Sequence, residues 1–120
     1  MEECLFCQKL KDKTDKVGET DNFMIIRDGF PVTEGHSLII PKRHVNKITE
    51  LTSDEFSELQ GIFSFLECKF NVDYNIGINC GKNAGQTIDH LHIHFIPRRE
   101  GDVENPRGGV RGVIPSKQNY

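Results

Sequence analysis

Three histidines at alternate positions constrain this chain more than any other feature. His90, His92 and His94 stand in the run Asp89-His90-Leu91-His92-Ile93-His94-Phe95. Because side chains alternate across a β-strand, this spacing places the imidazoles on one face and the apolar residues on the other. Three buried imidazoles carry six ring nitrogens that need partners, which a core position rarely supplies. The run therefore predicts a strand whose imidazole face binds a substrate or a metal.

Length and charge limit the class of protein. The 120 residues suffice for one ordinary domain, and a net charge of −3 gives no global basic field for nonspecific nucleic-acid binding. No stretch approaches the ~18 apolar residues of a membrane span. The acidic start Met1-Glu2-Glu3 does not fit a secretory signal. We expect a soluble, cytoplasmic protein with no membrane partner, and we do not expect nucleic acid as a partner.

One long helix is predicted over residues 53–70. Thr52 and Glu55 form a capping box, after which large apolar residues recur at helical spacing. These residues are Phe56, Leu59, Phe63, Leu66 and Phe70, with Ile62 and Phe65 widening the stripe. Such a stripe is usually core rather than a cofactor site, and we expect Cys68 to pack with it.

The remaining regular structure is predicted to be strands. β-type runs bounded by turn signals occur at 22–28, 36–41, 74–80 and 90–96. The first two could pair antiparallel. The fold class is therefore α+β with an antiparallel sheet.

The five histidines fall in two places along the chain. His36 and His44 bracket the second strand, and the other three share the fourth strand, so neighbouring strands would bring all five together. A neutral imidazole can attack phosphorus, and imidazole is also a common zinc ligand. His92, with neighbours on both sides, is the natural nucleophile. The spacing alone does not decide between the two chemistries.

The residues upstream of the three histidines favour a phosphate ligand. Asn79, Gln86 and Thr87 are neutral donors suited to phosphate oxygens, and glycines in the loop 81–87 allow close backbone approach. The loop lacks the Gly-Lys-Ser/Thr ending of a Walker loop.

These motifs, in this order, resemble the histidine triad (HIT) superfamily. The matching segments are Gly35-His36-Ser37-Leu38-Ile39-Ile40-Pro41-Lys42-Arg43-His44-Val45, Asn79, Gly85-Gln86-Thr87 and the alternating histidines, within residues 4–98. The resemblance implies a HIT-like fold: an antiparallel sheet of about five strands, one main helix and a short N-terminal element, commonly in a homodimer. It implies a HIT domain over 1–97 and a C-terminal tail over 98–120 packed on or near the site.

The resemblance also implies an activity and the residues that perform it. His92 would attack the α-phosphate of a nucleotide, giving a nucleotidyl-histidine intermediate that water resolves with release of a mononucleotide. The expected substrates are dinucleoside polyphosphates or related nucleoside 5′-phosphate derivatives, similar to those of diadenosine tetraphosphate hydrolase-like proteins. The backbone carbonyl of His90 would hold the His92 ring, and His94 would contact the phosphate or leaving group.

Further positions take roles from the same resemblance. His36 is grouped with the catalytic histidines. The substrate-binding positions are Asn79 and Thr87 on the phosphate, Gln86 beside the scissile bridge and Asp28 on the ribose hydroxyls. Asp28 before Gly29 is also a turn-forming residue on ordinary turn chemistry.

Cys4-Leu5-Phe6-Cys7 is similar to the N-terminal pair of a zinc-carrying branch of this superfamily. There the ligands correspond to Cys4, Cys7, His44 and His90, a composition suited to a closed structural Zn²⁺ site. The alternative is two reduced cysteines near a flexible N-terminus.

Other function classes stay open at this point. One is a nucleotide-binding or scaffold protein with little turnover, and another is a nucleotidyltransferase. Arg98, Arg99, Arg107 and Arg111 could neutralise a polyphosphate chain, or the tail could be a solvated basic segment. The motifs do not determine base preference, phosphate chain length, physiological role or oligomeric state.

Overall fold

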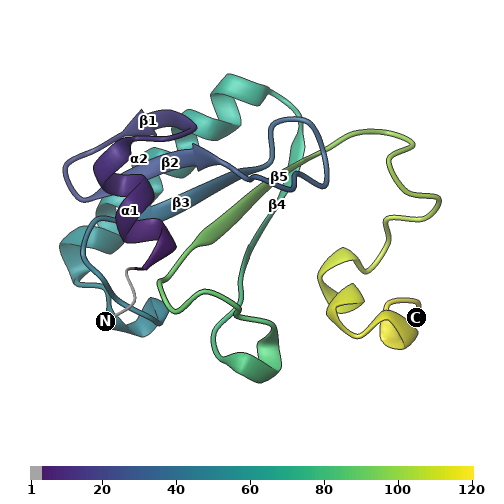
Figure 1. Cartoon of the computed structure of the whole chain (residues 1–120). Coiled ribbons are helices and arrows are strands. Elements are labelled where there is room, and N and C mark those ends of the chain that lie inside the picture. The colour runs from purple at the N-terminus through teal and green to yellow at the C-terminus, as the bar shows by residue number, and fades with distance from the viewer. Residues whose placement is uncertain (1–3) are drawn as a thin grey trace.

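The computed structural model describes residues 4–120, and the acidic start Met1-Glu2-Glu3 lies outside the described residues. Its five strands form one antiparallel sheet in the order β1-β2-β3-β5-β4 (Figure 1). The helices and strands are α1 (Leu5–Asp12), β1 (Lys16–Glu19), β2 (Phe23–Arg27), β3 (Ser37–Pro41), α2 (Ser53–Phe70), β4 (Asp73–Ile78) and β5 (Ile93–Arg98). The predicted α+β class, with one main helix and a short N-terminal element, is confirmed.

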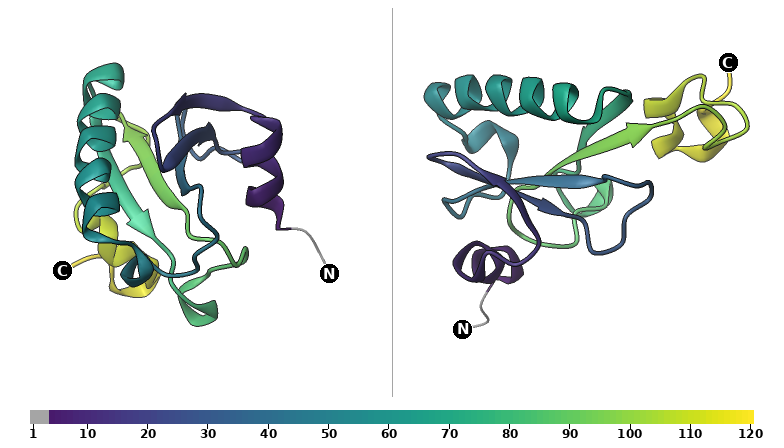
Figure 2. Two further views of the ribbon diagram at one scale, coloured as in Figure 1. Left: turned by 90° about the vertical axis from the view of Figure 1, so that its left-hand side faces the viewer. Right: turned by 90° about the horizontal axis from the view of Figure 1, so that it is seen from above.

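The sheet is the middle layer of three. Figure 2 shows α2 across one face and α1 on the other. Phe23 and Ile25 of β2 join the core cluster beneath α2, whereas Met24 and Ile26 join a second cluster with Phe6 of α1. Because the central strands β2 and β3 are covered on both faces, their sequences are continuous apolar runs rather than alternating patterns.

Helix α2 has the predicted bounds and the predicted capping box. The Thr52 hydroxyl accepts from the Glu55 N–H at 3.2 Å, and the Glu55 carboxylate accepts from the Thr52 N–H at 2.8 Å. The predicted core stripe is too wide, since Phe56 and Phe65 are about half exposed, at 47% and 48%. Cys68 is exposed, so its expected packing is wrong. A helix lying on a sheet buries only one narrow stripe, and these three side chains fall outside it.

The histidine run only partly belongs to a regular strand. Ladder pairing in β5 begins at Ile93, whereas the strand was predicted from residue 90. The alternation nevertheless holds, because Leu91, Ile93 and Phe95 lie in the α2 core cluster and the histidines face the α1 side. Strand β1 was not predicted, since Lys16–Glu19 is short and polar.

The segment after Arg98 leaves the sheet and folds back beyond the end of β5, away from α1 (Figure 1). It forms 3-10 helices at Gly109–Val113 and Pro115–Lys117. The Tyr120 ring lies 4.5 Å from the Arg107 guanidinium carbon and 4.9 Å from that of Arg111, which closes the tail on itself.

β1 and β4 are the edge strands of the sheet, where a second copy could pair. The homodimer stays a prediction.

Within residues 4–120, no helix has both the length and the apolar character needed to span a bilayer.

Candidate active site

Pairing between β3 and β5 brings the five histidines into two groups. Leu38 is the register partner of His94, so His36, just before β3, lies beside His94 on the α1 side of the sheet. His44 follows β3 and lies against His90, with ring centroids 4.9 Å apart. The strands therefore bring the five histidines together as predicted, but in two groups. One group lies around His92 and His94, and the second lies around His90.

The buried His92 ring is held in one tautomer. Its Nδ1 lies 2.9 Å from the His90 carbonyl oxygen, which only accepts, so Nδ1 carries the proton. Phe6 packs on the ring with centroids 5.0 Å apart. The neutral ring therefore has its lone pair on Nε2, as a nucleophile requires.

His36 holds the His94 ring in the opposite tautomer, with the proton on Nε2. The Val32 N–H donates to His36 Nδ1 at 3.1 Å, which places the proton of the neutral His36 ring on Nε2. That N–H lies 2.9 Å from His94 Nδ1 and 3.3 Å from the Asp28 carboxylate. Burial lowers the pKa of His36 and of His94, so both rings are neutral near pH 7. With Nδ1 accepting, His94 is left with an Nε2–H to donate.

A cavity of about 510 Å³ opens at the His92 and His94 rings. Its apolar lining includes Phe6, Ile26 and Leu38. The polar lining includes Asp28, Asn79, Thr87, His92 and His94, all of which were expected at the site, and two cations that were not expected there, Lys9 and Arg27. The cavity has the mixed lining typical of small-molecule sites.

Gln86 is the one predicted substrate-binding residue that the structure places elsewhere. Its Nε2 donates to the Asn46 side-chain oxygen at 2.8 Å, and its Oε1 accepts from the Gly81 N–H at 2.8 Å. It lines a neighbouring cavity rather than the one at His92. In this structure Gln86 ties two loops together.

The second histidine group forms a four-residue cluster with both N-terminal cysteines. Sulfur-to-nitrogen distances are 3.3 Å for Cys7 to His44, and 3.5 Å for Cys4 and for Cys7 to His90. A tetrahedral zinc with ordinary bonds holds sulfur and nitrogen about 3.5 Å apart. His90, fully buried, faces the Pro41 carbonyl with Nε2 at 2.9 Å, which leaves Nδ1 unprotonated toward the sulfurs. These four residues could hold a metal ion.

Comparison with known proteins identifies the architecture. The family model described as "HIT domain" matches residues 9–101. The chain belongs to the HIT domain family. It is 49% identical over 80 residues to the bis(5′-adenosyl)-triphosphatase of Dictyostelium discoideum, covering 62% of this chain and 54% of that protein. The chain thus spans about half the length of that relative.

Two further proteins are similar to this chain over most of its length. The adenosine 5′-monophosphoramidase of Saccharomyces cerevisiae is 36% identical over 100 residues, covering 81% of this chain and 63% of that protein. The crystal structure of a zinc-bound histidine triad family protein from Mycobacterium smegmatis superposes with a TM-score of 0.74 at 32% identity, covering 86% and 80% of the two chains.

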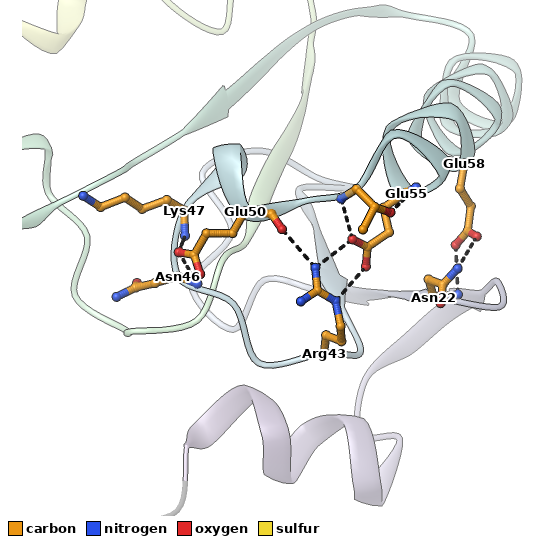
Figure 3. Close-up of polar contacts among 8 residues, drawn as sticks. Asn22, Arg43, Asn46, Lys47, Glu50, Glu55 and Glu58 are labelled. Atoms are coloured by element: carbon orange, nitrogen blue, oxygen red, sulfur yellow. Dashed lines mark hydrogen bonds and ion pairs between the residues drawn. The ribbon is translucent and has the colours of Figure 1, made fainter.

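An ion pair anchors the HIT-domain segment that carries His44. Figure 3 shows the Arg43 guanidinium bonded to both Glu55 oxygens and to the Glu50 carbonyl. Glu55 is only 5% exposed, and its hydrogen bonds from Arg43 and from the Thr52 N–H lower its pKa from 4.5 to about 2. The start of α2 and the segment that carries His44 are thereby fixed to each other.

Replacing Glu55 with glutamine is expected to lower the free energy of unfolding at pH 7 by about 1–3 kcal/mol. A carboxylate whose pKa is lower in the folded state stabilises the fold above pH 4.5, and this contribution is lost as pH falls toward 2. The difference in free energy of unfolding between wild type and Glu55→Gln should therefore decrease as the pH falls from 5 to 3. Urea unfolding at several pH values measures it, with Glu104→Gln in the exposed tail as control. A gap that stays constant with pH would contradict the assignment.

Sequence reasoning missed several contributors to the site, including Lys9 and Arg27 in the cavity wall. Phe6 packs on His92 from α1, and its only sequence signal was its place between two candidate metal ligands. Val32 acts through its backbone N–H, which no side-chain pattern reports. Within residues 4–120, none of the four tail arginines lines the His92 cavity.

Proposed function

We propose that this HIT domain is a nucleotidyl hydrolase that forms a covalent nucleotidyl-histidine intermediate on His92. The observation that carries the proposal is that His92 and His94 are held in opposite tautomers. His92 has an unprotonated Nε2 that can attack, and His94 has a protonated Nε2 that can donate. The relatives named as a triphosphatase and as a phosphoramidase support hydrolysis at a nucleoside 5′-phosphate.

The cavity favours a nucleoside 5′-phosphate as ligand. The apolar side chains of Phe6, Ile26 and Leu38 in the cavity wall suit the flat faces of a nucleobase. Asp28, which lines the same cavity, can accept from both ribose hydroxyls. With the nucleoside in this orientation, the α-phosphate lies near His92.

The reaction needs two displacements at phosphorus. His92 Nε2 forms a bond to the α-phosphorus while the bond from phosphorus to the leaving group breaks, and the electron pair departs with the leaving group. Nδ1–H, held by the His90 carbonyl, stabilises the positive charge that the ring gains. Water then attacks the same phosphorus, the N–P bond breaks, and the mononucleotide is released.

Neutral donors stabilise the phosphoryl oxygens in both steps. His94 Nε2–H can donate to an oxygen of the α-phosphate, and Asn79 and Thr87 line the same end of the cavity. Because burial keeps His36 and His94 neutral, His94 acts as a hydrogen-bond donor without competing as a charged acid.

The Cys4, Cys7, His44 and His90 cluster is proposed as a structural zinc site. Zinc there would supply no catalytic step, since the four ligands complete a tetrahedron. Bound to His90 Nδ1, it would leave the His90 carbonyl free to hold His92 and would fix α1 on the sheet. Phe6, between the two cysteines, would thereby be kept against the His92 ring.

The proposed function is tested by mononucleotide release from diadenosine triphosphate, diadenosine tetraphosphate and adenosine 5′-phosphoramidate. We expect AMP from at least one of them, measured by chromatography with the full chain. Tight AMP binding without release would instead indicate a binding protein. Release that requires added phosphate or sugar phosphate would indicate a transferase.

A further inference from the structure

A second cavity, of about 520 Å³, adjoins the one at His92. The two cavities share Gly85 and Thr87 in their walls. The shared wall is the loop after β4, so a chain of phosphates that starts beside His92 and Thr87 can continue into the second cavity. None of the roles assigned above uses this space.

The second cavity carries two unpaired cations. Lys47 and Lys82 both line it and are exposed, and within residues 4–120 neither ammonium forms a hydrogen bond or ion pair. Figure 3 shows the Lys47 side chain extending away from Glu50, whose carboxylate accepts from the Lys47 backbone N–H at 2.9 Å. Asp89 is the single carboxylate among the lining residues, in a chain whose formal charge is −3.

The two lysines lie on segments that Gln86 joins. Its carboxamide bonds to Asn46, the neighbour of Lys47, and to Gly81, the neighbour of Lys82. Gly81 has a φ of +95°, a conformation that favours glycine and sets the direction in which the loop leaves β4. The separation of the two backbone positions is therefore fixed before a ligand arrives, which lowers the entropic cost of binding one.

We propose that this cavity is the subsite for an anionic leaving group: Lys47 and Lys82 bind the phosphates beyond the scissile bond of a dinucleoside polyphosphate. The inference rests on the proposed function and adds a preference to it: substrates with a phosphate chain beyond the scissile bond gain contacts with the two lysines that other substrates lack. When the bond from His92 to phosphorus forms, the phosphorus–oxygen bond breaks and the bridging oxygen leaves with the electron pair. The leaving phosphate needs no proton, because the added negative charge lies between two ammonium groups.

A pair of substrates with the same nucleotide and different leaving groups tests the inference. Lys47→Ala/Lys82→Ala is expected to lower kcat/KM for diadenosine tetraphosphate by about 10- to 50-fold. Adenosine 5′-phosphoramidate, which has no phosphate beyond the scissile bond, should change by less than about 2-fold. Asp89→Asn should act in the opposite direction and raise kcat/KM for the tetraphosphate alone.

Lys69→Ala serves as the matched control, since it removes one exposed lysine that lies beside Phe70 and outside this cavity. Equal losses on both substrates, or no loss on the tetraphosphate, would overturn the inference while the proposed function stands. A wild-type chain that releases AMP from neither substrate would instead refute the proposed function itself.

Discussion

Replacing His92 with alanine is expected to reduce mononucleotide release by at least about 10⁴-fold, because the covalent route loses its nucleophile. No other described residue presents an unprotonated ring nitrogen in the same orientation: His94 has its acceptor nitrogen turned to His36, and His90 has its own turned to the cysteines. Steady-state release from the best substrate, compared with wild type at equal concentration, measures the loss.

The His92→Ala result is interpretable only if the variant folds and binds. His92 is 8% exposed and packs on Phe6, so its removal leaves a small cavity between α1 and the sheet. We expect a modest decrease in Tm and nearly unchanged affinity for AMP, measured by calorimetry. His94→Ala, which removes a donor but keeps the nucleophile, should lose only about 10²- to 10³-fold. Turnover of His92→Ala at the wild-type rate would exclude the covalent route.

The parts of the fold predicted from sequence are those with a strong local signal. The capping box at Thr52 and the helical apolar spacing located α2 at Ser53–Phe70, because cap and stripe are both local properties. The predicted burial of Phe56, Phe65 and Cys68 failed for a nonlocal reason. How much of a helix is covered depends on the width of the sheet beneath it, which spacing within the helix does not report.

The candidate site was predictable as a set of residues and not as an arrangement. Alternation placed His90, His92 and His94 on one face, and that prediction survives although ladder pairing begins only at Ile93. Two features were beyond the sequence: the tautomer of His36 depends on a backbone N–H, and Gln86 turns toward Asn46 rather than toward His92. Both depend on how loops distant in sequence meet, which no single motif encodes.

Substituting Cys7 with serine is expected to remove one zinc ion per chain and to lower the Tm by roughly 10–20 °C. The Cys4, Cys7, His44 and His90 donors have the spacing of a tetrahedral site, and serine is a poor fourth ligand. A zinc ion present at about 1,000 times its Kd adds about 4 kcal/mol to the free energy of unfolding. For a domain of this size, that corresponds to roughly 15 °C.

Metal content and stability together decide the zinc prediction. Native mass spectrometry of freshly purified protein should show one zinc per chain in wild type and none in Cys7→Ser, while Cys68→Ser, on the exposed face of α2, should keep both the zinc and the Tm. AMP affinity should also fall in Cys7→Ser, because α1 carries Phe6 and Leu5 into the His92 cavity and the zinc would hold α1 against the sheet. Metal-free wild-type protein with full activity, or a Cys7→Ser variant with unchanged Tm, would refute a structural zinc. In that case α1 would be held by the packing of Phe6 on His90, on His92 and in its apolar cluster with β2 and β3, and Phe6→Ala, rather than Cys7→Ser, should then release it.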